Sequence, residues 1–433
     1  MFGKYDKKTF NEIKSQHNIM VLVGNGFDIA LLNKYKTGKM KGKTSSYSDF
    51  YEYIKYYNLC DEKNILFKKM TEQMSYDSNW SDFELIINTL VLEGKIQQNK
   101  IEKSIDEFQN CFTRFLNDLV DADLLLKINS DVQEKELATQ SLGHFLNDLE
   151  SSCDIEFPSK TTYYDLYNFV FFNFNYTALL DNYLYLDKTQ FDPHYWKNAD
   201  RNFQFYPECG GSSGKNPTNW SSYLLTDIIH PHGIQEIPRS ILFGIDMDVY
   251  DKGRSKEKRF VKSYWAQYDI KYQSYFDEAE LFIIFGMSLS ITDGWWLDQI
   301  FDTILSKNAE LIIYKYKAEK EEDVKNIFIQ SCIRHAEESI RAIQKEMDSE
   351  LEKADNANTW LDYFVKYQDI EKLSRSVVVE LIRKIRVYDK KNIEITFDFD
   401  DCYQTLLSQL PAMGVDTVID DDNNLQVKVK EVV

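Results

Sequence analysis

The stretch that decides the fold reads Asn18-Ile-Met-Val-Leu-Val-Gly24-Asn-Gly26-Phe-Asp28. Its apolar first half stops at a pair of glycines, and a helix-compatible stretch, 28–33, follows. This order predicts a buried parallel strand that leads into a glycine turn at the N-terminus of a helix. Backbone amides at such a turn, helped by the helix dipole, form a ready site for phosphate or another anion. An ordinary strand-to-helix turn without a ligand gives the same pattern, so both interpretations stay open on these residues alone.

The turn departs from the dinucleotide-binding fingerprint. The pattern G-x-G-x-x-G requires a third glycine at position 29, where this chain has Ile29. A hydride-transferring Rossmann domain is therefore less favoured than a related nucleotide pocket. The two polar side chains in the turn, Asn25 and Asp28, suit hydrogen bonding to a ribose or an orienting role.

The composition is that of a large globular chain. Its 433 residues are 43% hydrophobic and 15% aromatic, which is enough for two or three domains with large cores. The formal net charge of -19 repels polyphosphate backbones, so we expect no strong nonspecific binding of nucleic acid. The basic run from Lys252 to Lys262 is interpreted as a solvated loop, with a local basic pocket as the alternative.

The cysteines and the apolar stretches indicate the compartment. Six cysteines occur without a C-x-x-C pair or a histidine at metal spacing, which is typical of a reducing cytosol and predicts no metal site. The N-terminus lacks the apolar core of a signal peptide, and the apolar stretch 281–291 is too short to span a bilayer. The sequence therefore predicts a cytoplasmic protein without a membrane partner.

The spacing of apolar residues predicts further elements. Helical spacing over 47–57, over 79–97 and onward to about 149 predicts a helical insertion at about 50–150. Short apolar runs bounded by polar residues predict strands. These strands are expected at 166–174, 241–244, 281–285 and 310–316, with an amphipathic helix at 293–305.

Strands that alternate with helices indicate the fold class. Over residues 1–317 they predict an α/β fold with a Rossmann-like, mostly parallel sheet and a site at the carboxyl ends of its strands. The strongly charged composition beyond this point predicts a separate C-terminal α+β module over 318–433. Within this module, helices are expected at 318–353 and 363–386, and strands at 392–399 and 425–432.

Four short motifs fall at predicted strand ends. They are Gly24-Asn25-Gly26-Phe27-Asp28, Phe174-Asn175-Tyr176-Thr177, His232-Gly233 and Gly286-Met287-Ser288-Leu289. The carboxyl ends of the strands in an open parallel sheet converge on one crevice. We therefore expect these four segments to share a pocket, although they are far apart in sequence.

Each polar residue in these motifs has a functional and a structural interpretation. Asn175 suits orienting a water or holding a ribose hydroxyl, or it satisfies backbone groups at a strand end. His232 suits a general base near neutral pH, or it is a buried structural histidine, and His230 is the alternative base. Ser288 suits a phosphate or ribose contact, or it bonds backbone within its own turn.

Two carboxylates of the helical insertion are further candidates. Asp82 and Glu84 lie two residues apart and do not share a helix face, so only one of them, Glu84, is expected to point into the pocket. A metal-dependent nuclease using Asp28, Glu84, His232 and Asp246 is one alternative function, and a non-catalytic nucleotide sensor is another. The chain has neither the G-x-S-x-G elbow of α/β-hydrolases nor the lysine motif of P-loop NTPases.

The order of these motifs resembles the AbiH family of bacteriophage abortive-infection proteins. The resemblance spans about residues 18–315 and rests on the four strand-end motifs. It rests in addition on three further features, which are Tyr47-Ser48-Asp49-Phe50, Trp80-Ser81-Asp82-Phe83-Glu84 and Asp293. The chain departs from the family at Met287, where the family usually has histidine. The resemblance implies a role in phage defence, with a phage-derived trigger and a homo-oligomer as possible partners.

The same arrangement is distantly similar to the sirtuin-type NAD-binding fold. That similarity implies cleavage of the N-glycosidic bond of NAD, with release of nicotinamide and depletion of NAD in the infected cell. Asn175 would position water or the nicotinamide ribose, His232 would act as base, and Asp28 would be a further catalytic residue. NAD, as substrate or ligand, would be held by Gly24, Asn25, Gly26, Phe27, Thr177, Gly286, Ser288 and Asp293.

Overall fold

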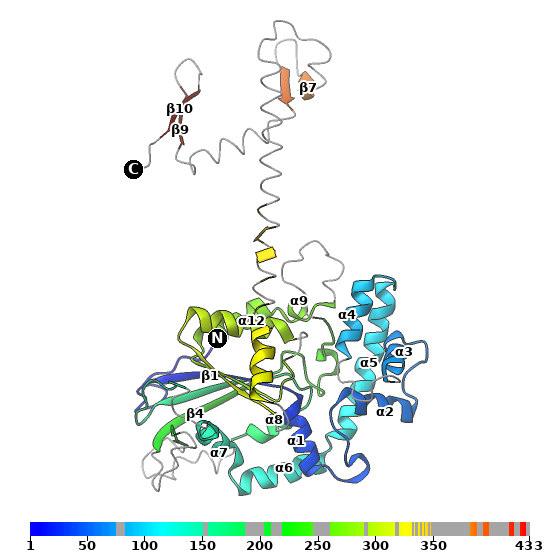
Figure 1. Ribbon diagram of the computed structural model, residues 1–433, viewed down its shortest axis with the longest axis vertical. Coiled ribbons are helices and arrows are strands. Elements are labelled where there is room, and N and C mark those ends of the chain that lie inside the picture. Colours follow the sequence, from blue (N-terminus) through cyan, green and yellow to red (C-terminus); the bar gives the residue numbers. More distant parts are fainter. Residues whose placement is uncertain are drawn as a thin grey trace. The chain divides into compact units, whose positions relative to one another are not determined.

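The computed structural model describes most of the first 330 residues and scattered parts of the rest (Figure 1). Described are residues 1–74, 83–149, 155–186, 203–208, 219–245, 260–289, 293–316, 320–330, 333, 337, 340, 341, 343, 344, 347, 382–387, 393–397, 415–419 and 425–429. The chain divides into two compact units, Met1–Glu338 and Ser339–Val433.

The first unit is built on a six-stranded sheet with the order β3-β4-β2-β1-β5-β6. Five of its strands are parallel, and β3 runs antiparallel to β4. The strands are β1 (Gln16–Val23), β2 (Leu166–Asn173), β3 (Phe203–Phe205), β4 (Trp220–Ile229), β5 (Leu281–Phe285) and β6 (Glu310–Tyr314). The predicted α/β class with a Rossmann-like, mostly parallel sheet is confirmed.

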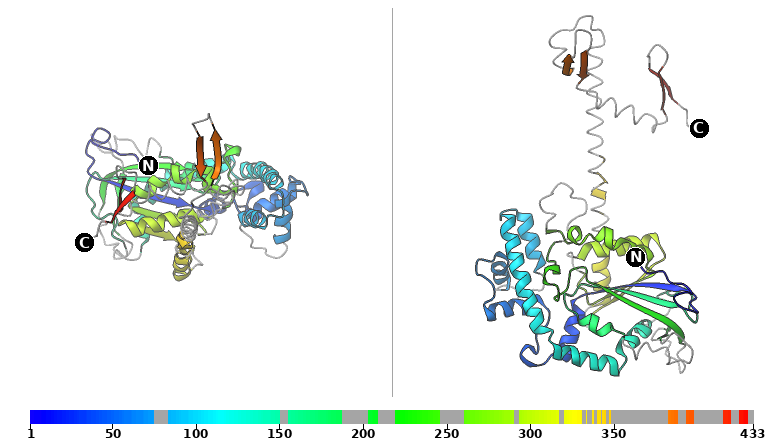
Figure 2. Two further views of the ribbon diagram at one scale, coloured as in Figure 1. Left: turned by 90° about the horizontal axis from the view of Figure 1, so that it is seen from above. Right: turned by 180° about the vertical axis from the view of Figure 1, so that it is seen from behind.

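The sheet is covered on both faces, which is why its central strands β1, β2 and β5 are mostly apolar. Met20 and Leu22 of β1 pack with three helices on one face, α10 (Tyr268–Lys271), α11 (Gln273–Glu278) and α12 (Gly294–Ser306). Ile19 and Val21 pack with α7 (Leu137–His144) and α8 (Leu179–Leu184) on the other face, and both layers are visible in Figures 1 and 2. Since β1 lies between β2 and β5 in register, the carboxyl ends of these three strands meet at one edge.

Helices follow the first strand and fill the predicted insertion. In chain order they are α1 (Asn25–Tyr35), η1 (Gly38–Met40), α2 (Tyr47–Tyr57), α3 (Ile65–Met74), α4 (Glu84–Glu93), α5 (Gln98–Leu119), α6 (Ala122–Glu134), α7 (Leu137–His144) and η2 (Phe145–Asp148). On α5, Ile101, Phe108, Phe112 and Phe115 recur on one face and are buried against α2 and α4. This aromatic face gives the insertion a core of its own.

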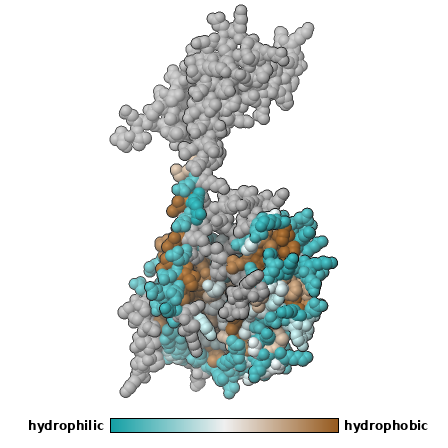
Figure 3. Space-filling model, turned by 45° about the vertical axis from the view of Figure 1, so that its right-hand side comes forward, coloured by the Kyte–Doolittle hydropathy of each residue, from teal (hydrophilic) through white to brown (hydrophobic). Residues whose placement is uncertain are grey.

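Further helices follow in the first unit. They are α8 (Leu179–Leu184), η5 (Pro238–Ser240), α9 (Lys262–Ala266), α10 (Tyr268–Lys271), α11 (Gln273–Glu278) and α12 (Gly294–Ser306), and residues 321–330 are also helical. In the part of the chain that is described, no helix combines the length and the apolar character needed to cross a bilayer. In Figure 3, hydrophobic residues are exposed between hydrophilic ones on the described part of the face that is drawn.

Several predicted elements differ from the observed ones. The helix predicted at 79–97 is found at Glu84–Glu93, where Gly94 adopts a left-handed conformation (φ 62°) that ends it, and 79–82 lie outside the described residues. Residues 241–244 form no strand, since the Leu242 amide donates to the His232 carbonyl oxygen rather than to a neighbouring strand. The strand β4, which the sequence did not predict, carries two serines, a threonine and an aspartate that obscure its pattern.

The second unit contains two antiparallel strand pairs in its described parts. One pair is β7 (Ile382–Val387) with β8 (Ile393–Phe397), and the other is β9 (Val415–Ile419) with β10 (Leu425–Val429). The strands predicted at 392–399 and 425–432 are found as β8 and β10. The helix predicted at 363–386 is wrong over its last residues, where β7 begins, and its remainder lies outside the described residues.

Candidate functional site

The glycine turn after β1 packs backbone to backbone against the turn after β5. The Gly24 amide donates to the Phe285 carbonyl oxygen and the Gly26 amide to the Gly286 carbonyl oxygen, both at 2.9 Å. A Cβ atom on Gly24 would lie 2.6 Å from the Gly286 oxygen, and Gly286 itself has φ 67°. Only glycine permits this approach, so the glycines in both motifs bring two strand-end turns together.

This packing restricts how the turn can bind an anion. The Phe27 amide donates to the Gly24 carbonyl oxygen, so the amides of Gly24, Gly26 and Phe27 are all bonded inside the protein. The exposed group at this helix end is the Asn25 side chain. Its Nδ2 donates to the Ser45 carbonyl oxygen at 3.3 Å, and its Oδ1 accepts a short hydrogen bond from the Ser45 hydroxyl. Side chains therefore offer the more accessible polar contacts at this turn.

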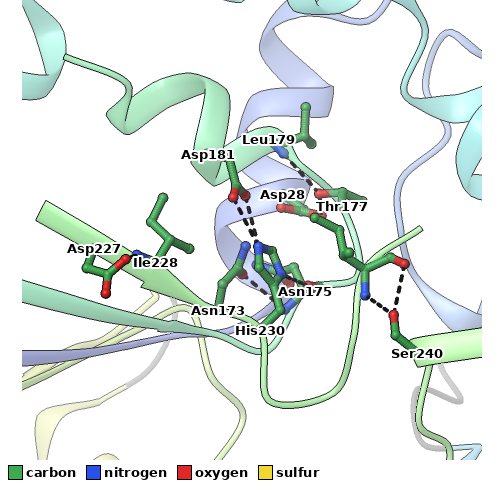
Figure 4. A network of polar contacts seen from close by, with 11 residues as sticks. Asp28, Asn173, Asn175, Thr177, Leu179, Asp181, Asp227, Ile228, His230 and Ser240 are labelled. Atoms are coloured by element: carbon green, nitrogen blue, oxygen red, sulfur yellow. Dashed lines mark hydrogen bonds and ion pairs between the residues drawn. The ribbon is translucent and has the colours of Figure 1, made fainter. Parts of the chain in front are cut away.

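Asp28 is the buried carboxyl of the site. It lies in the first turn of α1 with no exposed surface, and the Thr177 hydroxyl donates to its Oδ2 at 2.6 Å (Figure 4). Its Oδ1 is buried and has no hydrogen-bond partner among the described residues. Burial raises the pKa of Asp28 to about 7, outweighing the lowering by Thr177 and by nearby His230. This carboxyl therefore exchanges a proton near neutral pH.

Asn175 connects the segment after β2 to the glycine turn. Its Nδ2 donates to the Gly24 carbonyl oxygen at 3.0 Å, and its backbone amide donates to Asn173 Oδ1 at 3.1 Å. Both asparagines are buried, and Asn173 Nδ2 has no hydrogen-bond partner within the described ranges. Figure 4 shows both residues in the network that contains Asp28. This edge of the sheet thus carries a buried donor and a buried acceptor that the described chain leaves unused.

His230 belongs to the same network. It follows β4, and its Nε2 lies 3.1 Å from each carboxylate oxygen of Asp181 in α8. Its Nδ1 lies 3.4 Å from the Asn175 carbonyl oxygen, and its ring is only partly buried. The carboxylate orients the imidazole, as in many sites where a histidine transfers protons. Of the two candidate histidines, His230 is the one beside Asp28.

His232 lies in a different cluster. Its Nε2 is 2.7 Å from the Tyr268 hydroxyl, and its ring packs edge-on against Phe174 with centroids 5.1 Å apart. Burial, followed by the charge of Lys262, lowers the pKa of His232 well below its ordinary value. The imidazole is therefore neutral at physiological pH and can accept a hydrogen bond, but it is a weak base.

Lys262 is the charged centre of the second cluster. Its Nζ lies 2.8 Å from Glu84 Oε2 and 3.6 Å from Asp293 Oδ1, and its side chain is buried. Burial lowers the pKa of Lys262, but the two carboxylates outweigh it and hold the pKa well above its ordinary value. The interpretation of 252–262 as a solvated loop is therefore wrong at Lys262, and 252–259 lie outside the described residues.

The segment after β2 separates the two clusters. The rings of Phe174 and Tyr176 lie against His232, whereas the side chains of Asn175 and Thr177 bond to the Gly24 carbonyl oxygen and to Asp28. The predicted site residues therefore form two groups. Asp28, Asn175, Thr177 and the glycine turns make one, and His232 and Asp293 belong to the other.

The remaining candidates are scattered. Ser288 is exposed beside the Gly286 turn, and Asp82, Asp246 and Asp248 lie outside the described residues. The described residues contain no group of three or more histidine, cysteine or acidic side chains that could hold a metal ion. Two features of the site were not predicted from the sequence. One is Asp181, whose only signal was its position four residues after Thr177 on the following helix. The other is the pairing of Lys262 with Glu84.

Two sequence families match the chain. The family described as Bacteriophage abortive infection AbiH matches residues 20–315, more than half of the chain. A domain of unknown function (DUF4368) matches residues 346–399. No curated protein is similar enough to the chain to count as a match.

Proposed function

Since the chain belongs to the AbiH family of bacteriophage abortive-infection proteins, we propose that it halts infected cells by cleaving the N-glycosidic bond of NAD. The observation that carries this proposal is Asp28, a carboxyl in the first turn of α1 with a pKa of about 7 and a buried oxygen that has no hydrogen-bond partner among the described residues. Nucleotides bind to open parallel sheets at this edge, outside the carboxyl ends of the central strands. A carboxyl that titrates near pH 7 is suited to acid–base work there.

The proposed reaction is hydrolysis at the nicotinamide ribose. The bond from C1′ to the nicotinamide nitrogen breaks, and its electron pair leaves with neutral nicotinamide. A water oxygen forms the new bond to C1′ and gives up a proton. The ionised Asp28 carboxylate would accept that proton or stabilise the positive charge that develops on the ribose. Thr177 would hold the carboxylate, and Asn175 would orient the water or a ribose hydroxyl.

The phosphates of NAD would lie over the glycine turns. Because the amides of Gly24, Gly26 and Phe27 bond inside the protein, we assign the polar contacts to the exposed side chains of Asn25 and Ser288. The glycines, including Gly286, would keep the two turns free of side chains that a ligand would have to displace. Asp293 would act indirectly, since its carboxylate lies beside Lys262.

Two histidines compete for the role of base. His232 is the base that the resemblance implies, although burial and the charge of Lys262 lower its pKa and so weaken it as a proton acceptor. His230 is the second candidate, because it lies in the Asp28 network and is oriented by Asp181. Separate His230→Ala and His232→Ala variants distinguish these roles, and only the variant that lacks the base would lose turnover while still binding NAD.

Nicotinamide release from NAD by the purified protein, alone and with lysate from phage-infected cells, tests the proposal. We expect Asp28→Asn and Asn175→Ala to lower turnover by about 100-fold or more. Asp227→Asn, which changes an exposed carboxylate on β4, is the matched control and should keep full activity. Equal release by all four proteins would contradict the proposed roles. NAD binding without release, even with infected lysate, would instead identify a nucleotide sensor.

A further inference from the structure

A row of exposed hydrophobic residues follows the AbiH-matched region. The described residues 321–330, 333, 337, 340, 341, 343, 344 and 347 are helical. Six hydrophobic side chains among them are 45% to 59% exposed, a degree that is unusual for isoleucine and methionine. They are Ile327, Ile329, Ile333, Ile340, Ile343 and Met347. Scattered exposed hydrophobic residues need no explanation, but all of these except Ile327 recur at regular intervals.

The intervals are those of a heptad repeat. Ala336 fills the one gap in the row, and the six positions then follow one another by four, three, four, three and four residues. Such spacing keeps one apolar seam on a helix and is typical of the a and d positions of a coiled coil. The a positions hold Ile333, Ile340 and Met347, and the d positions hold Ile329, Ala336 and Ile343. One heptad earlier, the a position holds Asn326.

We propose that the apolar seam of Ile329, Ile333, Ile340, Ile343 and Met347 pairs with the same seam of a second copy of this chain, as in a parallel, two-stranded coiled coil. The sequence at the seam favours an identical partner. A single asparagine at an a position fixes register and a two-stranded state, because in parallel register it meets its own counterpart across the seam. By itself, isoleucine at the d positions would favour a coiled coil of three or four helices. Asn326 at an a position instead favours the two-stranded form.

The charges that flank the seam are compatible with self-association. In a parallel pair, each g residue meets the e residue five positions later in the partner. The resulting pairs are Lys325 with Gln330, Cys332 with Glu337, and Ser339 with Gln344. None of these pairs brings like charges together, although the chain as a whole carries a net charge of -19. The seam thus offers an identical helix an apolar surface without charge repulsion. This inference does not depend on NAD cleavage.

Sedimentation of the full-length protein over a range of micromolar concentrations tests the proposal. The wild type should sediment as a dimer, and Ile340→Asp should halve the measured mass, because it places two carboxylates within the seam. Ile327→Asp is the matched control: Ile327 is helical and 47% exposed but lies off the seam, so this variant should remain dimeric. A monomeric wild type, a trimer, or an Ile340→Asp variant that is still a dimer would overturn the proposal.

Cross-linking gives a second readout that does not depend on the stability of Ile340→Asp. In the parallel pair the two copies of residue 340 face each other across the seam, whereas residue 341 points away from it. Under mild oxidation Ile340→Cys should therefore form a covalent dimer above the wild-type background, and Arg341→Cys should not. An Ile340→Cys variant that stays monomeric on a non-reducing gel would contradict the parallel register.

Discussion

Asp28 links the local chemistry of one residue to the stability of the first unit. An unfolded Asp28 ionises near pH 3.8, whereas the folded one keeps its proton up to about pH 7 because it is buried. The folded state therefore binds the extra proton. Binding this proton adds roughly 4 kcal/mol to the free energy of unfolding below pH 3.8. That contribution is lost as the pH rises from 3.8 to about 7.

Asp28→Asn should remove this pH dependence, since an amide does not titrate. Between about pH 5 and about pH 8, the denaturation midpoint of the variant should fall less than that of the wild type. Chemical denaturation followed by tryptophan fluorescence measures the difference, with Asp227→Asn as the control. Parallel pH profiles for Asp28→Asn and the wild type would show that Asp28 ionises in the folded protein as it does in water.

Thr177 controls the same carboxyl through one hydrogen bond. Because the bond from the Thr177 hydroxyl lowers the pKa of Asp28, Thr177→Val should raise it further. The loss of the bond should also destabilise the first unit by about 1 to 3 kcal/mol. If Asp28 acts as the base in NAD cleavage, the pH at which turnover is half-maximal should move upward. A downward shift, or a lower rate with no shift, would mean that Thr177 does not act on Asp28.

Among the elements, α4 and α9 are joined by the buried pair of Glu84 and Lys262. Lys262→Met should destabilise the protein by about 3 to 5 kcal/mol, because it leaves buried carboxylates without the charge that balances them. Glu84→Gln with Lys262→Met should recover part of this loss. Thermal unfolding of both single variants and the double variant measures the coupling. Additive losses would show that the two side chains act independently.

The two strand-end turns that meet at Gly286 form a second junction between elements. An alanine Cβ at Gly286 would lie 2.9 Å from the Phe27 amide and 3.0 Å from Gly26 Cα, in a left-handed backbone. Gly42 is also left-handed, at φ 80°, but a Cβ there meets nothing within 4 Å. Gly286→Ala should therefore destabilise the protein well beyond the roughly 1 kcal/mol that we expect for Gly42→Ala. Equal melting temperatures for the two variants would show that the turns can separate without cost.

Elements were predictable from the sequence where one local pattern determined them. The strand β5 was predicted to the residue, because its continuous apolar run is bounded by charged Glu280 and by Gly286. The strand β4 was missed because it pairs with β2 on one side and only with short β3 on the other, so polar residues interrupt its pattern. Residues 241–244 have the apolar character of a strand, but no neighbouring strand is available to pair with them.

The candidate site was predictable only in part, for a similar reason. The order of the strands in the sheet brings their carboxyl ends together. Two contacts agree with this expected convergence: Asn175 bonds to Gly24, and Thr177 bonds to Asp28. Which way each side chain points was not visible in the sequence. The burial of Lys262 depends on Glu84, which is 178 residues away, and no local pattern in a basic run indicates such a partner.

At the scale of the whole molecule, net charge separates the leading function from the nuclease alternative. A nuclease must bring phosphates to its site, and a charge of -19 opposes that approach at long range. Fluorescence anisotropy of labelled duplex DNA should therefore show no binding even at low salt, with or without added magnesium. A protein that neutralised several phosphates would bind at low salt and lose affinity steeply as salt is added. Such a salt-dependent isotherm, together with cleavage that EDTA abolishes, would establish the nuclease and exclude NAD cleavage as the sole activity.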